Sequence, residues 1–166
     1  MNYKRLIISL ALPQLAGIVG SFFTTPAIST WYATLQRPSF SPPNWLFGPV
    51  WITLYILMGI SIYLIWQKVD ENPPSPKASD GQGKIARGAM WLFWIHLFFN
   101  AIWSIIFFGL QNPGLAFINI IIIWLFIIAL MVKFWKINRW ATYLLIPYLL
   151  WVSFASILNY FIWYLN

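Results

Sequence analysis

The sequence predicts an all-α integral membrane protein, built as a bundle of five transmembrane helices. Of its 166 residues, 61% are hydrophobic and only 8% are charged, whereas soluble domains carry roughly 25% charged residues. The apolar residues also form five long continuous runs. A transmembrane β-barrel would instead show short segments of alternating polarity. Because backbone groups in lipid must hydrogen-bond internally, each run is expected to be a helix, within one membrane domain over residues 1–166.

Each run approaches or exceeds the roughly 20 apolar residues that a helix needs to cross the hydrocarbon layer. The expected helices cover residues 6–24, 45–66, 89–110, 115–132 and 142–164. The first is uncharged and too long for the apolar core of a cleaved signal peptide. The third is uncharged apart from the titratable His96, and the fourth contains Asn119. Pro49 and Pro147 are expected to bend the second and fifth helices, because proline removes a backbone donor.

The connections between these helices differ in character. Residues 25–44 contain four prolines and Arg37, which predicts an ordered outer loop, and ordered loops of this length are usually functional. Residues 68–88 are rich in Pro, Gly, Ser and charge, which is typical of a flexible linker. Residues 111–114 read Gln-Asn-Pro-Gly, a turn signal that predicts antiparallel packing of the third and fourth helices.

The positive residues predict the orientation of the bundle. Nine of the ten Lys and Arg residues fall on the side of the N-terminus, and Arg37 alone falls on the other. Under the positive-inside rule, the N-terminus is cytoplasmic, while the 25–44 loop and the C-terminus lie outside. The net charge of +7 then serves topology and attraction to anionic lipids. No nucleic-acid partner is expected, and the charge bias favours a bacterial plasma membrane.

Several kinds of chemistry are not expected from this composition. The chain has no cysteine, which excludes disulfides and thiolate metal ligands. The only acidic residues are Asp70, Glu71 and Asp80, all within residues 68–88, so the spans lack the carboxylates that a proton relay or cation pathway needs. One histidine without an acidic partner makes no catalytic triad. We therefore predict no metal site, no cofactor and no dedicated catalytic residue, and expect a largely apolar ligand.

Polar and aromatic residues inside the spans are the candidates for function. His96, Asn100, Trp103 and Phe107 share one face of the third helix. Hydrogen bonds between helices would explain His96 and Asn100 without any ligand, and a haem-ligand role for His96 would need an open metal position. Small residues along the first helix, from Gly17 to Thr24, fit either close helix approach or space for a flat ligand.

The 12 tryptophans divide into two groups. Those at the ends of the spans are expected to anchor the protein at the membrane interface. Trp103, Trp124 and Trp151 lie in mid-span, and Trp51 lies two turns into the second helix. A buried indole N–H needs a partner from protein, water or ligand. Ordinary core packing is one explanation of this pattern, and an aromatic-lined cleft is the other.

Four blocks of residues then follow in order along the chain: Trp31-Tyr32-x-x-Leu35-x-Arg37-Pro38-Ser39-Phe40-x-Pro42-Pro43, Pro49-Val50-Trp51-x-x-Leu54-Tyr55-x-x-Met58-Gly59, Leu97-x-x-Asn100-x-x-Trp103-Ser104-x-x-Phe107-Phe108-Gly109 and Pro147-Tyr148-Leu149-x-Trp151-x-x-Phe154-Ala155-x-x-Leu158-Asn159. In these blocks the sequence resembles the translocator protein family, also called the tryptophan-rich sensory protein or peripheral-type benzodiazepine receptor (TspO/MBR) family. The resemblance covers essentially the whole chain except residues 69–88.

The resemblance implies a five-helix bundle, often dimeric, whose cleft lies between the first, second, third and fifth helices under the first loop. It further implies binding of tetrapyrroles such as protoporphyrin IX. The candidate ligand-binding residues in the matching blocks are Trp51, Trp151, Ala155, Asn100, Trp103, Tyr55 and Tyr148. Some family members are reported to degrade porphyrin in light, and in that case Trp51 and Trp151 would be the reactive residues.

The sequence also departs from the family pattern. His96 stands where the family usually has Gln, which could change the polarity of the ligand or admit a metalloporphyrin, so it joins the candidate site. Sterol binding is not expected, because no basic residue follows Asn159 and Tyr160. Arg37 is the only basic residue on the outer side and can face a porphyrin propionate. Its alternative role is packing within the loop.

The leading hypothesis is a membrane receptor or carrier that binds porphyrin-like ligands and regulates porphyrin handling or a stress response. One alternative is a weak, light-dependent porphyrin-degrading enzyme. Another is a scaffold or lipid-handling protein without a specific small ligand, in which residues 68–88 would carry the partner contacts. A homodimer is expected from the resemblance.

Overall fold

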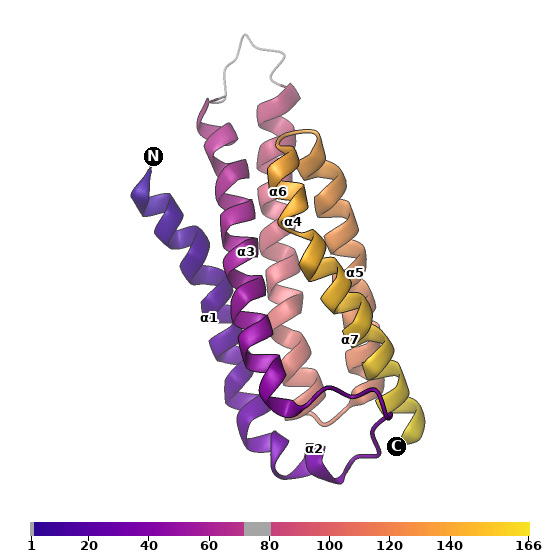
Figure 1. Ribbon diagram of the computed structural model, residues 1–166. Helices are drawn as coiled ribbons and strands as arrows, with labels where there is room; N and C mark the ends of the chain where they lie inside the picture. Colours follow the sequence, from indigo (N-terminus) through magenta and orange to yellow (C-terminus); the bar gives the residue numbers. More distant parts are fainter. Residues whose placement is uncertain (1, 72–80) are drawn as a thin grey trace.

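The computed structural model of the protein describes residues 2–71 and 81–166. Within that part of the chain, five helical segments are long and apolar enough to cross a membrane: Tyr3–Ile28, Asn44–Val69, Gly83–Gly109, Pro113–Trp135 and Arg139–Leu165. They form an elongated bundle with the two termini at opposite ends (Figure 1). The predicted all-α fold with five membrane-spanning helices is confirmed.

The helices run further than the hydropathy alone predicts. The elements are α1 (Tyr3–Ile28), α2 (Trp31–Thr34), α3 (Asn44–Glu71), α4 (Gly81–Ser104), the π-helix η1 (Ile105–Gly109), α5 (Pro113–Trp135), α6 (Arg139–Tyr143) and α7 (Ile146–Leu165). Residues 68–71 and 81–88 are therefore helical, which corrects the prediction of a flexible linker there. A packed span has already nucleated the helix, so extending it into polar residues costs little. Residues 72–80 of that linker lie outside the described residues.

The fifth span is interrupted rather than bent. The chain leaves α6 at Leu144, and Pro147 occupies the first turn of α7. Proline lacks the N–H that a continuous helix would use and clashes with the carbonyl four residues earlier. It is well tolerated in the first turn of a new helix. In contrast, α3 continues through Pro49 without a break.

The bundle has two ends of different character. We call the end that carries α2 and residues 35–43 the loop end, and the opposite end, where Lys4, Lys133 and Arg139 lie, the basic end (Figure 1). The assignment of the basic end to the cytoplasm remains a prediction. The half toward the basic end is solidly packed, since Ile62, Phe93 and many other apolar side chains there are fully buried.

Lipid-facing and neighbour-facing positions separate clearly on the helices. On α5, Ile118 and Leu125 are 59% and 57% exposed, whereas Ile127 is fully buried. α4 and α5 lie side by side, and the Asn119 side chain donates a hydrogen bond to the Phe99 carbonyl oxygen at 3.0 Å. The predicted turn at residues 111–114 therefore joins two neighbouring helices. Apolar side chains exposed on such a bundle face lipid, which is a favourable environment for them.

Candidate ligand-binding site

The half of the bundle toward the loop end contains a cavity of about 560 Å³. Its walls come mainly from α1, α3, α4 with η1, and α7, and α5 contributes only Ile120 and Ile123. The volume lies within the range of roughly 300–1,000 Å³ that is usual for small-molecule sites. These helices are the first, second, third and fifth spans, the arrangement that the resemblance implied.

The cavity brings together six of the nine predicted site residues. They are Trp51, Tyr55, Asn100, Trp103, Trp151 and Ala155. Trp51 and Trp151 come from α3 and α7, two helices that are distant in sequence, and their rings contribute to the wall of the same cavity. The small residues Gly17, Gly20, Ser21 and Thr24 of α1 also line it. The small side chains of α1 therefore leave space for the cavity as well as allowing neighbouring helices to pack closely.

Neighbouring rings hold the aromatic walls in place. The ring centroid of Trp51 lies 5.4 Å from that of Tyr55 and 6.2 Å from that of Tyr148. Trp151 lies 5.9 Å from Phe47 in an edge-to-face arrangement. Rings packed in this way have little rotamer freedom. The cavity consequently presents preformed flat surfaces, the shape that suits a planar ligand.

The buried indole N–H groups differ in whether the protein satisfies them. Trp103 donates to the Asn159 side-chain oxygen at 3.1 Å, and Trp124 donates to Ser153 Oγ at 2.9 Å. The indole nitrogen of Trp151 is buried and has no hydrogen-bond partner among the described residues. Because a buried N–H normally has a partner, the Trp151 indole is the one of these three whose hydrogen-bonding capacity the described residues leave unused.

His96, Asn100, Tyr55 and Tyr148 form one hydrogen-bonded chain. Tyr55 Oη donates to Asn100 Oδ1, Asn100 Nδ2 donates to Tyr148 Oη, and Tyr148 Oη lies beside His96 Nε2, each at 2.8 Å. Tyr148 already accepts from Asn100, so its own proton can go to His96 Nε2. The direction of the Tyr148–His96 hydrogen bond depends on the tautomer of the imidazole, and together these bonds link α3, α4 and α7 through one polar chain.

Tyr148 and His96 thus stand behind the cavity wall rather than on it. Tyr148 is 1% exposed and His96 is fully buried, and neither lines the cavity. Their hydrogen bonds join different helices. Such bonds explain the polar residues His96 and Asn100 on the third helix without a ligand. The Nε2 atom that a metalloporphyrin would need is already bonded to Tyr148.

Replacing Tyr148 by Phe is expected to lower the free energy of unfolding by about 1–2 kcal/mol, since two interhelical hydrogen bonds are lost at roughly 0.6–1 kcal/mol each. The ring is retained, so packing changes little. Thermal or denaturant unfolding of the purified protein in detergent measures this effect. Tyr160, which is 40% exposed, gives the matched Tyr160→Phe control. Equal stability of the two variants would show that the hydrogen bonds of Tyr148 contribute nothing to the free energy of unfolding.

The loop between α1 and α3 contributes Tyr32 to the cavity wall and carries Arg37 close to it. The Arg37 guanidinium donates to Asn44 Oδ1 at 3.3 Å and lies 5.2 Å from the Tyr32 ring centroid. Asn44 and Tyr32 line the cavity, whereas Arg37 itself does not. Burial raises the pKa of Tyr32, although Arg37 acts in the opposite direction. Tyr32 therefore remains a neutral phenol and does not neutralise the positive charge of Arg37.

Sequence reasoning missed the residue that fastens this loop. The Asn166 side chain accepts from the Gln36 N–H at 2.9 Å and donates to the Gln36 carbonyl at 3.0 Å. Reasoning from the sequence also did not identify Gln14, Asn44 and Asn159 as cavity-lining residues. No local pattern distinguishes them, because their role depends on contacts between distant helices.

The π-helix η1 is another feature that hydropathy does not predict. It carries Phe107 and Phe108, both of which line the cavity. The Leu110 N–H bonds to the Ile105 carbonyl at 2.8 Å, the five-residue spacing that widens a helix turn. Such segments occur frequently at functional sites.

Five membrane-spanning helices around an aromatic-lined cavity define a multi-pass integral membrane protein with a preformed internal site. Comparison with known families agrees with this class. The TspO/MBR family model matches residues 9–165, and the chain belongs to this family.

Individual relatives align along most or all of the chain. The tryptophan-rich protein TspO of Archaeoglobus fulgidus is 40% identical over 166 residues, covering 100% of this chain and 99% of the relative. The protein of the same name from Chlorobaculum tepidum is 38% identical, with 100% and 99% coverage. The human translocator protein is 36% identical over 151 residues, covering 91% of this chain and 83% of its own.

Proposed function

We propose that the protein is a membrane receptor or carrier that binds tetrapyrroles such as protoporphyrin IX in the cavity and thereby regulates porphyrin handling or a stress response. The observation that carries the proposal is the shared cavity wall of Trp51 and Trp151. A porphyrin is a flat, apolar ring, and indole faces from two helices offer it large stacking surfaces.

The distribution of polar groups supports a ligand with a charged edge. Gln14, Ser21 and Asn44 line the cavity on α1 and at the start of α3. Arg37 lies next to Asn44 at the loop end. Two of the three acidic residues of the chain, Asp70 and Glu71, lie in the last turn of α3 at the basic end. A carboxylate-edged ligand would therefore place its acidic groups toward Arg37 and its ring between the tryptophans.

The direct test is a titration of the purified protein with protoporphyrin IX in the dark, followed by tryptophan emission. Binding in the cavity should quench part of the emission saturably, because several tryptophans line the site. Quenching that stays linear in porphyrin concentration would contradict the proposal. A discrete new absorbing product that forms only in light would instead favour the porphyrin-degrading alternative.

The role of Arg37 can be isolated by changing the ligand as well as the protein. Arg37→Gln should weaken binding of protoporphyrin IX about three- to fivefold, because an exposed ion pair contributes up to about 1 kcal/mol. It should leave binding of the dimethyl ester unchanged, since the ester has no carboxylate. Equilibrium titrations of both ligands measure this difference. An equal loss for acid and ester would assign Arg37 to loop packing instead.

A further inference from the structure

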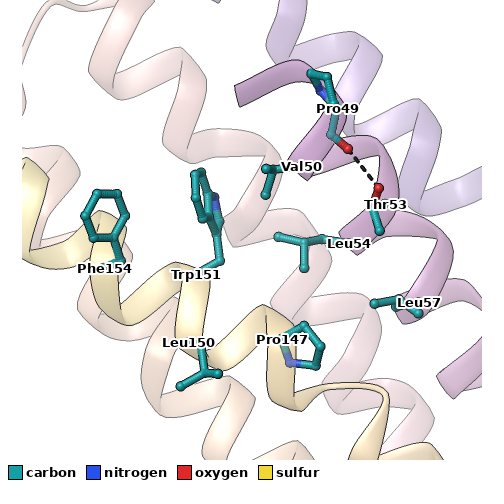
Figure 2. Close-up of a pocket in the computed structure, with 9 residues that line it drawn as sticks. All are labelled: Pro49, Val50, Thr53, Leu54, Leu57, Pro147, Leu150, Trp151 and Phe154. Carbon is teal, nitrogen blue, oxygen red and sulfur yellow. Dashed lines mark hydrogen bonds between the residues drawn. The ribbon is translucent and has the colours of Figure 1, made fainter. Parts of the chain in front are cut away.

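A second hollow lies on the side of the bundle, between α3 and α7. Its volume is also about 560 Å³, and it is lined by Pro49, Val50, Thr53, Leu54, Leu57, Pro147, Leu150, Trp151 and Phe154. Figure 2 shows Trp151 of α7 beside Val50 and Leu54 of α3, with Phe154 on the side of Trp151 away from α3. Leu150 is 65% exposed, so the hollow is open to the surroundings of the bundle. We call it the α3–α7 groove.

The groove differs chemically from the internal cavity. Thr53 is its only lining residue with a polar side chain, apart from the indole of Trp151. The Thr53 hydroxyl donates to the Pro49 carbonyl at 2.9 Å within the same helix (Figure 2). The internal cavity, by contrast, is lined by Gln14, Asn44, Asn100 and other polar side chains. The groove thus suits an occupant that needs no hydrogen bond.

The position of the groove along α3 limits which molecules can reach it. α3 has 28 residues and is about 42 Å long, so it exceeds the roughly 30 Å hydrocarbon layer at both ends. Pro49 to Leu57 cover about 12 Å, beginning about 8 Å from the start of the helix. When the middle of α3 is placed at the middle of the hydrocarbon layer, the whole length of the groove lies within that layer. Lipid alkyl chains are then the molecules available to occupy it.

We propose that the α3–α7 groove binds one acyl chain of a bilayer lipid. An unfilled groove would forfeit dispersion contacts along both helices, and in lipid such packing, rather than the hydrophobic effect, drives association. Trp151 lines both the groove and the internal cavity. The bound chain therefore packs against the same indole that forms a wall of the internal site.

Photolabelling with a lipid tests this proposal without any porphyrin, so its outcome is independent of the proposed function. The full-length protein is reconstituted in phosphatidylcholine vesicles containing a small fraction of phosphatidylcholine with a diazirine in mid-chain. After irradiation, adducts are mapped by mass spectrometry. Adducts on Thr53, Leu57 and Leu150 should exceed those on the exposed α5 residues Ile118 and Leu125 about fivefold, which corresponds to about 1 kcal/mol of preference.

A matched pair of variants checks that the groove itself is labelled. Thr53→Phe fills the groove and should reduce its adducts to the level of the α5 face. Ile121→Phe, on the lipid-facing side of α5, should leave the groove adducts unchanged. Equal labelling of the groove and the α5 face in the unmodified protein would overturn the proposal. So would protection of Leu150 from lipid adducts, which is the result expected if a second copy of the protein occupied the groove.

Discussion

Replacing Trp51 and Trp151 together by Phe is expected to weaken protoporphyrin IX binding by about tenfold or more, the equivalent of about 1.4 kcal/mol. Each substitution removes part of a flat wall of the cavity. The change at Trp151 also removes an N–H that has no hydrogen-bond partner among the described residues. A hydrogen bond of that kind to a ligand contributes about 0.5–1.5 kcal/mol, so the two losses together reach the expected magnitude.

The matched control for this experiment uses two tryptophans that lie outside the cavity. Trp91 and Trp140 are 72% and 73% exposed, so the Trp91→Phe and Trp140→Phe double variant should bind as the unmodified protein does. Isothermal titration calorimetry is the suitable measurement, because it does not depend on the tryptophans that remain. Unchanged affinity in the Trp51 and Trp151 double variant would show that porphyrin binds elsewhere.

Replacing Gly59 by Ala should lower the free energy of unfolding by about 2–3 kcal/mol, a typical cost of overpacking. A Cβ atom at Gly59 would lie 2.7 Å from the Ser9 carbonyl oxygen and 3.0 Å from the Leu10 Cα atom. Both atoms belong to the backbone of α1, so no side-chain rotation relieves the clash. α1 must therefore move away from α3. Because α1 also lines the cavity through Gly17 and Gly20, porphyrin binding should weaken in the same variant.

Replacing Gly88 by Ala should change the free energy of unfolding in the opposite direction. Nothing lies within 4 Å of a Cβ atom built at Gly88, which sits inside α4. Alanine is more favourable than glycine in a helix interior by roughly 0.5–1 kcal/mol, so this variant should be slightly more stable. Thermal unfolding in detergent measures both changes. If the Gly59 and Gly88 variants unfold alike, the close approach of α1 and α3 does not limit stability.

The membrane fold follows from local properties of the chain. The thickness of the bilayer sets the length of each apolar run, so the five spans can be read from hydropathy without any knowledge of packing. Their ends are less predictable. α3 and α4 continue into residues that composition marks as a linker, because a helix anchored by its packed part extends at little cost.

Part of the candidate site also follows from the sequence. The motifs around Trp51 and Trp151 single out two tryptophans from different spans, and both line the same cavity. The periodicity of the third helix places His96 and Asn100 on one face, but it does not say what that face meets. Only the packed structure shows that Asn100 lines the cavity, whereas His96 is fully buried and hydrogen-bonded to Tyr148.

The composition and order of the residues determine that this protein spans the membrane five times and carries aromatic side chains at mid-depth. The tertiary structure alone decides which of these side chains meet. Asn166 hydrogen-bonds to Gln36, which is 130 residues away in the sequence, and Tyr148 hydrogen-bonds to His96, which is 52 residues away. Such contacts depend on the angles and rotations at which helices pack, and neither hydropathy nor helical periodicity specifies these quantities.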